Sequence, residues 1–218
     1  MTFSLGSTPR SLVKYNDQSI SAITEVGSGA GVTDDMVLIK TLTASTSSTL
    51  SFVDGADDVV LDNTYSTYMF KFINIHPGTN NIVFEFQGNA AGGSGYNETI
   101  TSAAFRSYHF EGDTEAVLAY LVNEDQANGT DYQHLTNGVG IENDMSCNGE
   151  LYLFNPSSTT FVKHFMCRFQ FHEASPGSFE HYTSGYFNTT SAIDEIQFKM
   201  SSGNIDAGDI KLYGIKDS

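Results

Sequence analysis

The six histidines are the residues of this chain with the most direct capacity for acid–base chemistry or metal binding. Two of them, His164 and His172, have the same parity along one predicted strand and so project from the same face of it. Eight residues at about 3.3 Å each place them about 26 Å apart, too far to share a metal ion. The chain has no H-x-H, H-x-x-x-H or C-x-x-C spacing. We therefore expect no metal site, and we interpret each histidine as a structural or surface residue.

The motifs that resemble catalytic or calcium-binding loops all depart from the required pattern. The acidic stretch 123–131, "NEDQANGTD", has Ala127 and Asn128 where an EF-hand needs an acid or amide followed by glycine. The sequence around Ser94, "GNAAGGSGY", imitates a nucleophile elbow but lies in a predicted loop rather than between a strand and a helix. No pair among the 26 acidic residues can be singled out for glycoside hydrolysis. The sequence therefore predicts no catalytic residue, no cofactor and no enzymatic activity.

The tyrosines suggest a different chemistry, because an exposed aromatic ring can stack on a sugar. The chain has 11 Tyr and no Trp. Tyr96 lies in a glycine-rich loop, and Tyr182 and Tyr186 lie in the stretch "EHYTSGYF". These three are the candidate glycan contacts, with the loops 88–97 and 123–147 as the surface around them. The alternative, which we favour, is that the rings cover the surface of the domain and leave their hydroxyls in water.

The charge balance narrows the range of partners. The chain has 10 Lys and Arg against 26 Asp and Glu, a formal net charge of −16. Such a field repels phosphate backbones and anionic lipid, so we expect neither nucleic acid nor membrane as a partner. No run approaches the roughly 18 apolar residues of a membrane span, and the N-terminal residues do not have the pattern of a secretory signal. We interpret the excess of acidic residues as a feature that keeps the protein soluble and prevents self-association.

The two cysteines, Cys147 and Cys167, lie in separate segments and give no framework of paired spacings. We expect two free, buried thiols in a protein made in the cytoplasm. A single disulfide between them is the alternative.

From residue 37 onward the chain consists of short runs rich in β-branched and aromatic residues, separated by Gly, Asn, Asp and Ser clusters. The predicted strands are 37–43, 48–53, 66–75, 81–87, 100–110, 149–155, 161–172, 180–187, 194–200 and 209–215. Alternation is clearest in 161–172, where one parity is predicted to face the core: Phe161, Lys163, Phe165, Cys167, Phe169 and Phe171. About ten antiparallel strands predict an all-β fold, a jelly-roll-like β-sandwich over residues 37–218.

Three segments are less regular. Residues 1–36 are predicted to form an extended N-terminal arm with a glycine hinge at Gly27, Gly29 and Gly31. The segment after Asp113 fits either a short helix or a further strand, and 134–147 is expected to be irregular.

The C-terminal strand 209–215 is expected to pair between two neighbours rather than to end the sheet. We expect Gly203 and Gly208 to shape the turn that leads into it.

Three stretches resemble structural proteins of marine tailed phages, including phages of cyanobacteria. They are "YMFKFINIHPGTNNIVFEFQGNAAGGSGYNETITSAAFRSYH", "LFNPSSTTFVKHFMCRF" and "YFNTTSAIDEIQFKMSSGNIDAGDIKLYGI". The resemblance covers residues 37–215 and implies a jelly-roll virion component without enzymatic activity, made in the host cytoplasm. It implies a capsid decoration (cement) protein or a tail-associated protein, whose partners are the major capsid protein or tail proteins. By analogy with such proteins we expect a homo-oligomer, a trimer. The alternative is a receptor-binding, carbohydrate-binding module of the tail.

Overall fold

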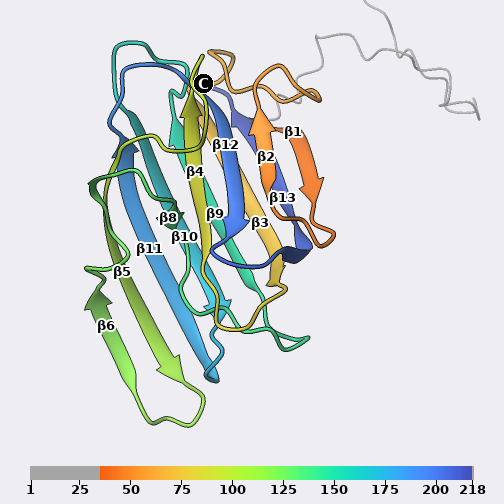
Figure 1. Ribbon diagram of the computed structural model, residues 1–218, viewed down its shortest axis with the longest axis vertical. Coiled ribbons are helices and arrows are strands. Elements are labelled where there is room, and N and C mark those ends of the chain that lie inside the picture. The colour runs from red at the N-terminus through yellow and green to blue at the C-terminus, as the bar shows by residue number, and fades with distance from the viewer. Residues whose placement is uncertain (1–34, 218) are drawn as a thin grey trace, which may run out of the picture. The chain divides into compact units, whose positions relative to one another are not determined.

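The computed structural model describes residues 35–217, which form two antiparallel sheets and contain no helix (Figure 1). The nine-stranded sheet runs in the order β1 (Met36–Thr43), β13 (Ile205–Ile215), β3 (Thr67–Pro77), β9 (Cys147–Phe154), β10 (Lys163–His172), β11 (Gly177–Phe187), β5 (Ile100–Phe110) and β6 (Ala116–Tyr120), with β7 (Ala127–Gly129) paired to β5. The four-stranded sheet runs β2 (Leu50–Val53), β12 (Ile193–Met200), β4 (Phe84–Ala90) and β8 (Gln133–His134).

The predicted all-β, jelly-roll-like β-sandwich is confirmed. The chain passes repeatedly between the two sheets, because β2, β4, β8 and β12 belong to the small sheet and the strands between them to the large one. The meander β9–β10–β11 forms the middle of the large sheet. The smaller sheet covers one face of the larger, so that only the inner faces of both sheets are buried together.

The core between the sheets is built mainly from phenylalanine rings. Phe198 of β12 lies at its centre and is fully buried. Its ring contacts five others, with centroid distances of 6.3 Å to Phe52, 5.3 Å to Phe70, 5.0 Å to Phe72, 6.0 Å to Phe84 and 6.2 Å to Phe86. Because Phe70 and Phe72 belong to the large sheet, this cluster joins the two layers of the sandwich.

The alternation predicted for residues 161–172 is confirmed from Lys163 onward, where inward residues are buried and most outward ones exposed. The placement of Phe161 in the core is wrong: Phe161 precedes β10 and is 69% exposed. The backbone N–H of Phe161 donates to the Ser158 hydroxyl, and this turn ends the alternation. Lys163 is buried, and its ammonium group donates to the carbonyls of Phe161 and Thr189. Burial lowers the pKa of Lys163.

The C-terminal strand β13 lies between β1 and β3, as expected, so both of its edges are hydrogen-bonded. Gly203 lies in the turn before it with φ +74°. Gly208 instead lies within β13, at an irregularity of its pairing with β3, with φ +117°. A Cβ there would lie 2.6 Å from the carbonyl oxygen of Asn74, so this close approach requires glycine.

The alternative left open after Asp113 is resolved in favour of a strand, since Ala116–Tyr120 pairs with β5 as β6. Residues 135–146 are irregular apart from single bridges at Val139. Strand β1 begins at Met36, one residue before the predicted domain boundary. The predicted arm as far as residue 34, with its hinge glycines, lies outside the described residues.

Candidate functional site

We call "outer face" the side chains of the nine-stranded sheet that point away from the four-stranded sheet. Figure 1 views the sandwich from the opposite, four-stranded side. Strand alternation places most of the large hydrophobic side chains that are exposed in residues 35–217 on this outer face. They are Met36, Leu38, Phe105, Leu118, Tyr120 and Met166. The outer face is therefore the main apolar surface of the described part of the chain.

The most ordered feature of this face is an aromatic platform. Tyr182 of β11 and Phe105 of β5 are direct cross-strand partners, and their rings stack at 4.8 Å and 8°. Tyr120 of β6 is the next partner along the row. On the other side, the Arg168 guanidinium lies 5.5 Å from the Tyr182 ring and forms an ion pair with Glu180. A flat ring beside a cation and a carboxylate can stack on a sugar or on an apolar side chain of a protein partner.

A second apolar row crosses the other half of the face. Leu38, Tyr213, Met69, Tyr152 and Met166 are successive partners on β1, β13, β3, β9 and β10. Met69 is nearly buried although it points outward, and the large side chains of its partners Tyr213 and Tyr152 flank it. Met166, at the end of the row, is 57% exposed. Beyond Met166 the row continues with the small residues Ser184 and Ala103.

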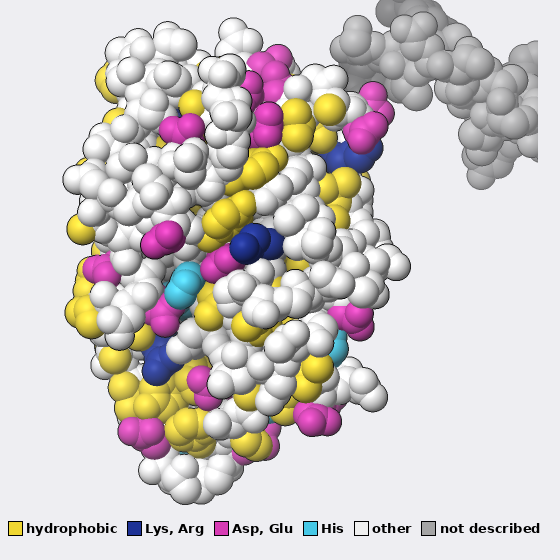
Figure 2. Space-filling view, in the orientation of Figure 1, with side chains coloured by type: hydrophobic (Ala, Val, Ile, Leu, Met, Phe, Trp, Pro, Cys, Tyr) yellow, Lys and Arg dark blue, Asp and Glu magenta, His cyan; other side chains and the backbone are white. Residues whose placement is uncertain are grey.

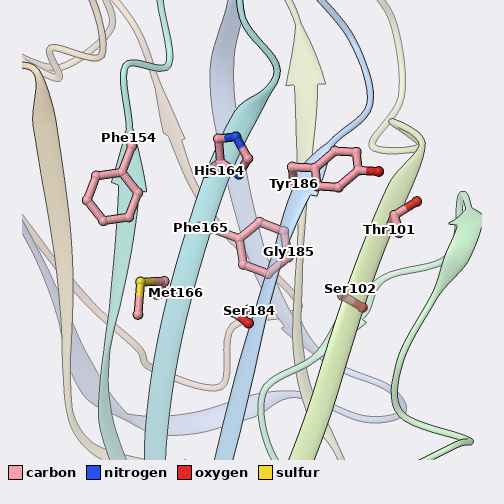
Figure 3. Close-up of a pocket in the computed structure, with 9 residues that line it drawn as sticks. All are labelled: Thr101, Ser102, Phe154, His164, Phe165, Met166, Ser184, Gly185 and Tyr186. Carbon is pink, nitrogen blue, oxygen red and sulfur yellow. The ribbon is translucent and has the colours of Figure 1, made fainter.

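These small residues leave a depression of about 440 Å³ over β10, β11 and β5 (Figure 3). Phe154 and Met166 line it on one side and Thr101 and Tyr186 on the other, with Gly185 between them. The His164 ring meets the Tyr186 ring at 5.7 Å. Within the described residues, no Asp or Glu lines this depression. Its walls therefore suit an apolar or aromatic group rather than a metal ion.

Two further depressions lie on the same face. One, of about 420 Å³, is lined by charged groups that include Lys71, Glu150, Arg168 and Glu180. The other, of about 340 Å³, lies near His109 and His172. All three are shallow and lie side by side over the strands, as is typical of a contact surface rather than of one deep ligand pocket.

The structure brings together two of the three predicted glycan contacts. Tyr182 and Tyr186 lie on the same face of β11, one in the aromatic platform and one in the depression. Tyr96 is elsewhere: its hydroxyl donates to Glu195 Oε2 at 2.8 Å, next to β12 of the small sheet. The candidate loops 88–97 and 123–147 contain the end of β4 and all of β8, which also belong to the small sheet.

Sequence reasoning missed Phe105, Tyr120 and Met166 as members of the face. Met166 had outward parity in its predicted strand, and an apolar residue among outward polar ones is the signal that could have identified it. Phe105 has the opposite parity to the buried Ala104. Tyr120 could be assigned to the outer face only once the pairing of its strand, β6, with β5 was known.

The face shown in Figure 2, that of the small sheet, carries acidic, basic and histidine side chains near its middle. There His134 Nδ1 pairs with Glu124, and its Nε2 lies 3.8 Å from Glu85 Oε2. Lys199 Nζ lies 3.5 Å from Glu85 Oε1. Burial acts to lower the pKa of His134, but the hydrogen bond and charge of Glu124 outweigh it and raise that pKa. Residues 35–217 contain no group of three or more His, Cys, Asp or Glu arranged to hold a metal ion. In this cluster the positive groups of His134 and Lys199 therefore balance the carboxylates of Glu85 and Glu124.

Both thiols are free and buried, as expected, and no disulfide links Cys147 with Cys167. Burial raises the pKa of both thiols, that of Cys167 to about 12. Neither has the thiolate character that nucleophilic chemistry needs.

No helix within residues 35–217 is long and apolar enough to cross a membrane. Comparison with protein-family models, curated proteins and solved structures found no match for this chain.

Proposed function

We propose that this chain is a non-enzymatic structural component of a tailed-phage virion, a capsid decoration (cement) protein or a tail-associated protein that docks through its outer face. The observation that carries the proposal is the gathering of exposed large hydrophobic residues on one face of a rigid sandwich. Soluble proteins rarely leave such a face uncovered unless it is a contact surface.

The remaining chemistry of the chain supports an assembly role. The thiols are buried, and the most buried carboxylates and histidine of the small sheet's outer side are paired with one another. The depressions on the outer face are open and shallow, whereas catalytic pockets are usually deep and enclose their substrate. The acidic balance of the chain would keep assembled particles dispersed.

The sequence resemblance to virion proteins of marine tailed phages suggests the setting. On a head, the sandwich would bridge neighbouring capsid subunits against the pressure of packaged DNA. On a tail, the same face would attach it to other tail proteins.

Purified particles of the phage that encodes this chain provide the test. Quantitative mass spectrometry of gradient-purified virions is expected to find the protein in multiple copies that survive high-salt washing, because an apolar contact is not screened by salt. Particles assembled with the Met166→Glu variant should lose it, while particles with the control Phe161→Glu should retain it. Absence of the unaltered protein from washed virions would contradict the proposal.

The platform of Tyr182 and Phe105 favours one second candidate, a carbohydrate-binding module that recognises the host surface. Isolated protein would then bind polysaccharide extracted from host cells, and Tyr182→Ala would weaken binding at least about fivefold, since stacking on a sugar ring contributes about 1 kcal/mol or more. Tyr96→Phe is the matched control, because Tyr96 lies away from the outer face. No binding at millimolar saccharide would exclude this candidate.

A further inference from the structure

The charged residues of the outer face are balanced, although the chain as a whole has a formal net charge of −16. Within the regularly paired parts of the strands, which leave out the irregular start of β13 with its exposed Asp206, the charged side chains that project outward are Lys71, Arg168, Lys211, Glu150, Glu180 and Asp209. Positive and negative groups are equal in number. A basic partner would be attracted to the acidic surfaces and would gain little here. A second copy of this chain, equally acidic, would meet little repulsion at such a balanced face.

The distribution of large and small side chains over the same face is also asymmetric. The row that crosses the sheet begins with the large residues Tyr213, Met69 and Tyr152 and ends with Met166, Ser184 and Ala103. The 440 Å³ depression lies at the small-residue end. Along this row, the side toward β13 is therefore raised and the side toward β5 is hollowed.

From these two observations we propose that a second copy of the chain packs on the outer face, about a two-fold axis that runs along the strands between β9 and β10. This inference rests on the assignment of the outer face as a contact surface and names its partner. Such an axis reverses the lateral order of the strands and keeps each residue's position along them. Tyr152 then faces Met166 of the second copy, Met69 faces Ser184, and Tyr213 faces Ala103.

The same axis also pairs the charged row. Lys211, Lys71, Glu150, Arg168, Tyr182 and Phe105 are successive partners across six strands. Rotation about the axis places Glu150 opposite Arg168 of the second copy. It also places Lys71 opposite Tyr182 and Lys211 opposite Phe105 of the second copy, so that no two cations face each other in this row.

The available area is sufficient for a stable dimer. The six strands that this axis brings into contact, β13, β3, β9, β10, β11 and β5, at about 4.8 Å spacing and about 33 Å length, offer roughly 900 Å² per copy, the size of a standard interface. Two sheets packed this way would resemble an ordinary aligned sandwich with its strands offset by about 30°.

Sedimentation equilibrium of the full chain over a wide concentration range tests the proposal. The unaltered protein is expected to be a dimer in reversible equilibrium. Met166→Glu should raise the dissociation constant roughly 100-fold or more, because it places a charge without a partner at the centre of the contact. Phe161→Glu, the matched control at an exposed residue that does not project from the outer face, should leave it unchanged.

Charge exchange provides a second arm that does not depend on a buried charge. Glu150→Arg alone or Arg168→Glu alone should weaken the dimer, and the combined E150R/R168E variant should recover most of the lost affinity. A monomer at all concentrations, a trimer, or a dimer that Met166→Glu leaves intact would overturn the inference. A monomer that is nevertheless present in washed virions would overturn only the pairing. A dimer absent from virions would overturn only the proposed function.

Discussion

The rings of Tyr182 and Phe105 stack almost parallel, 4.8 Å apart, on a surface that faces away from the core of the sandwich. A cross-strand aromatic pair of this kind stabilises a sheet even where solvent reaches it. The pair also gives the outer face a rigid aromatic centre, next to the cation of Arg168. Stability and the proposed recognition thus involve the same two residues, and the two roles can be measured separately.

A double-mutant cycle of Tyr182→Ala and Phe105→Ala should give a coupling free energy of about 0.5–1.5 kcal/mol in urea unfolding, the range for stacked rings. The measurement should use Met166→Glu as background, so that the unfolding transition reports on the monomer. A coupling free energy of zero would mean that the two rings do not stabilise each other in solution.

The core prediction concerns Phe198, which contacts five other phenylalanine rings between the sheets. Phe198→Ala is expected to lower the free energy of unfolding by about 3–5 kcal/mol, because the cavity cannot be filled by rings from two rigid sheets. Leu118→Ala is the control: Leu118 is 75% exposed on β6, and its loss should change the free energy of unfolding of the same monomeric background by less than about 0.5 kcal/mol. Equal effects of the two substitutions would contradict the assigned core.

The pair of His134 and Glu124 should make stability depend on pH in a defined window. The pKa of His134 is raised above its ordinary value of 6.5 in the folded chain, so its contribution is complete below that pH and is lost as the pH rises through the folded pKa. The pKa of Glu124 is lowered below its ordinary value of 4.5, so its contribution is present above that pH and is lost as the pH falls through the folded pKa. The destabilisation caused by His134→Gln should therefore be greatest between about pH 4.5 and 6.5 and should shrink toward pH 9.

Other titratable groups lie near His134 and include Glu85, Asp131 and the buried His181. They are present in the unaltered chain and in the His134→Gln variant, so their effects largely cancel when the two free energies of unfolding are subtracted. His109→Gln is the control, since His109 pairs only with the exposed Asp113. A destabilisation by His134→Gln that is constant from pH 5 to pH 9 would show that the ion pair contributes nothing.

The thiols offer a simple test of burial. Cys147 and Cys167 should react with a thiol reagent such as dithionitrobenzoate only when the chain unfolds, because burial raises the pKa of both and excludes the reagent. Reductant should leave the unfolding midpoint unchanged, since no disulfide exists to be reduced. Rapid labelling of the native protein at pH 8 would show that the sandwich opens locally near these strands.

Most of the sandwich was predictable from the sequence because strand alternation is a local signal. Residues 100–110 match β5 at both ends, and the inward positions of β10 from Lys163 onward were correctly assigned by parity. The strand predicted at 81–87 begins three residues later in the structure, at Phe84 of β4. In the structure Ile82 makes only an isolated bridge to Val139, a contact with a distant segment that no local pattern reveals.

The candidate surface was only partly predictable, since it depends on which strands become neighbours. Tyr182 and Tyr186 were identified as exposed aromatics, but Phe105, the cross-strand partner of Tyr182, comes from a strand more than seventy residues earlier in the chain. Tyr96 was grouped with them by residue type alone. The contact of Tyr96 with Glu195 separates it from the other two, while the pairing of β5 with β11 and with β6 adds Phe105 and Tyr120.

A cryo-EM map of the intact phage particle tests the central claim most directly. The account predicts this sandwich at repeated positions on the particle, with the outer face of β9, β10, β11 and β5 buried against a second copy or another virion protein. The small-sheet face, with its paired charges, should remain in solvent. Density in which the outer face is open to solvent, or a particle that lacks this sandwich, would contradict the claim.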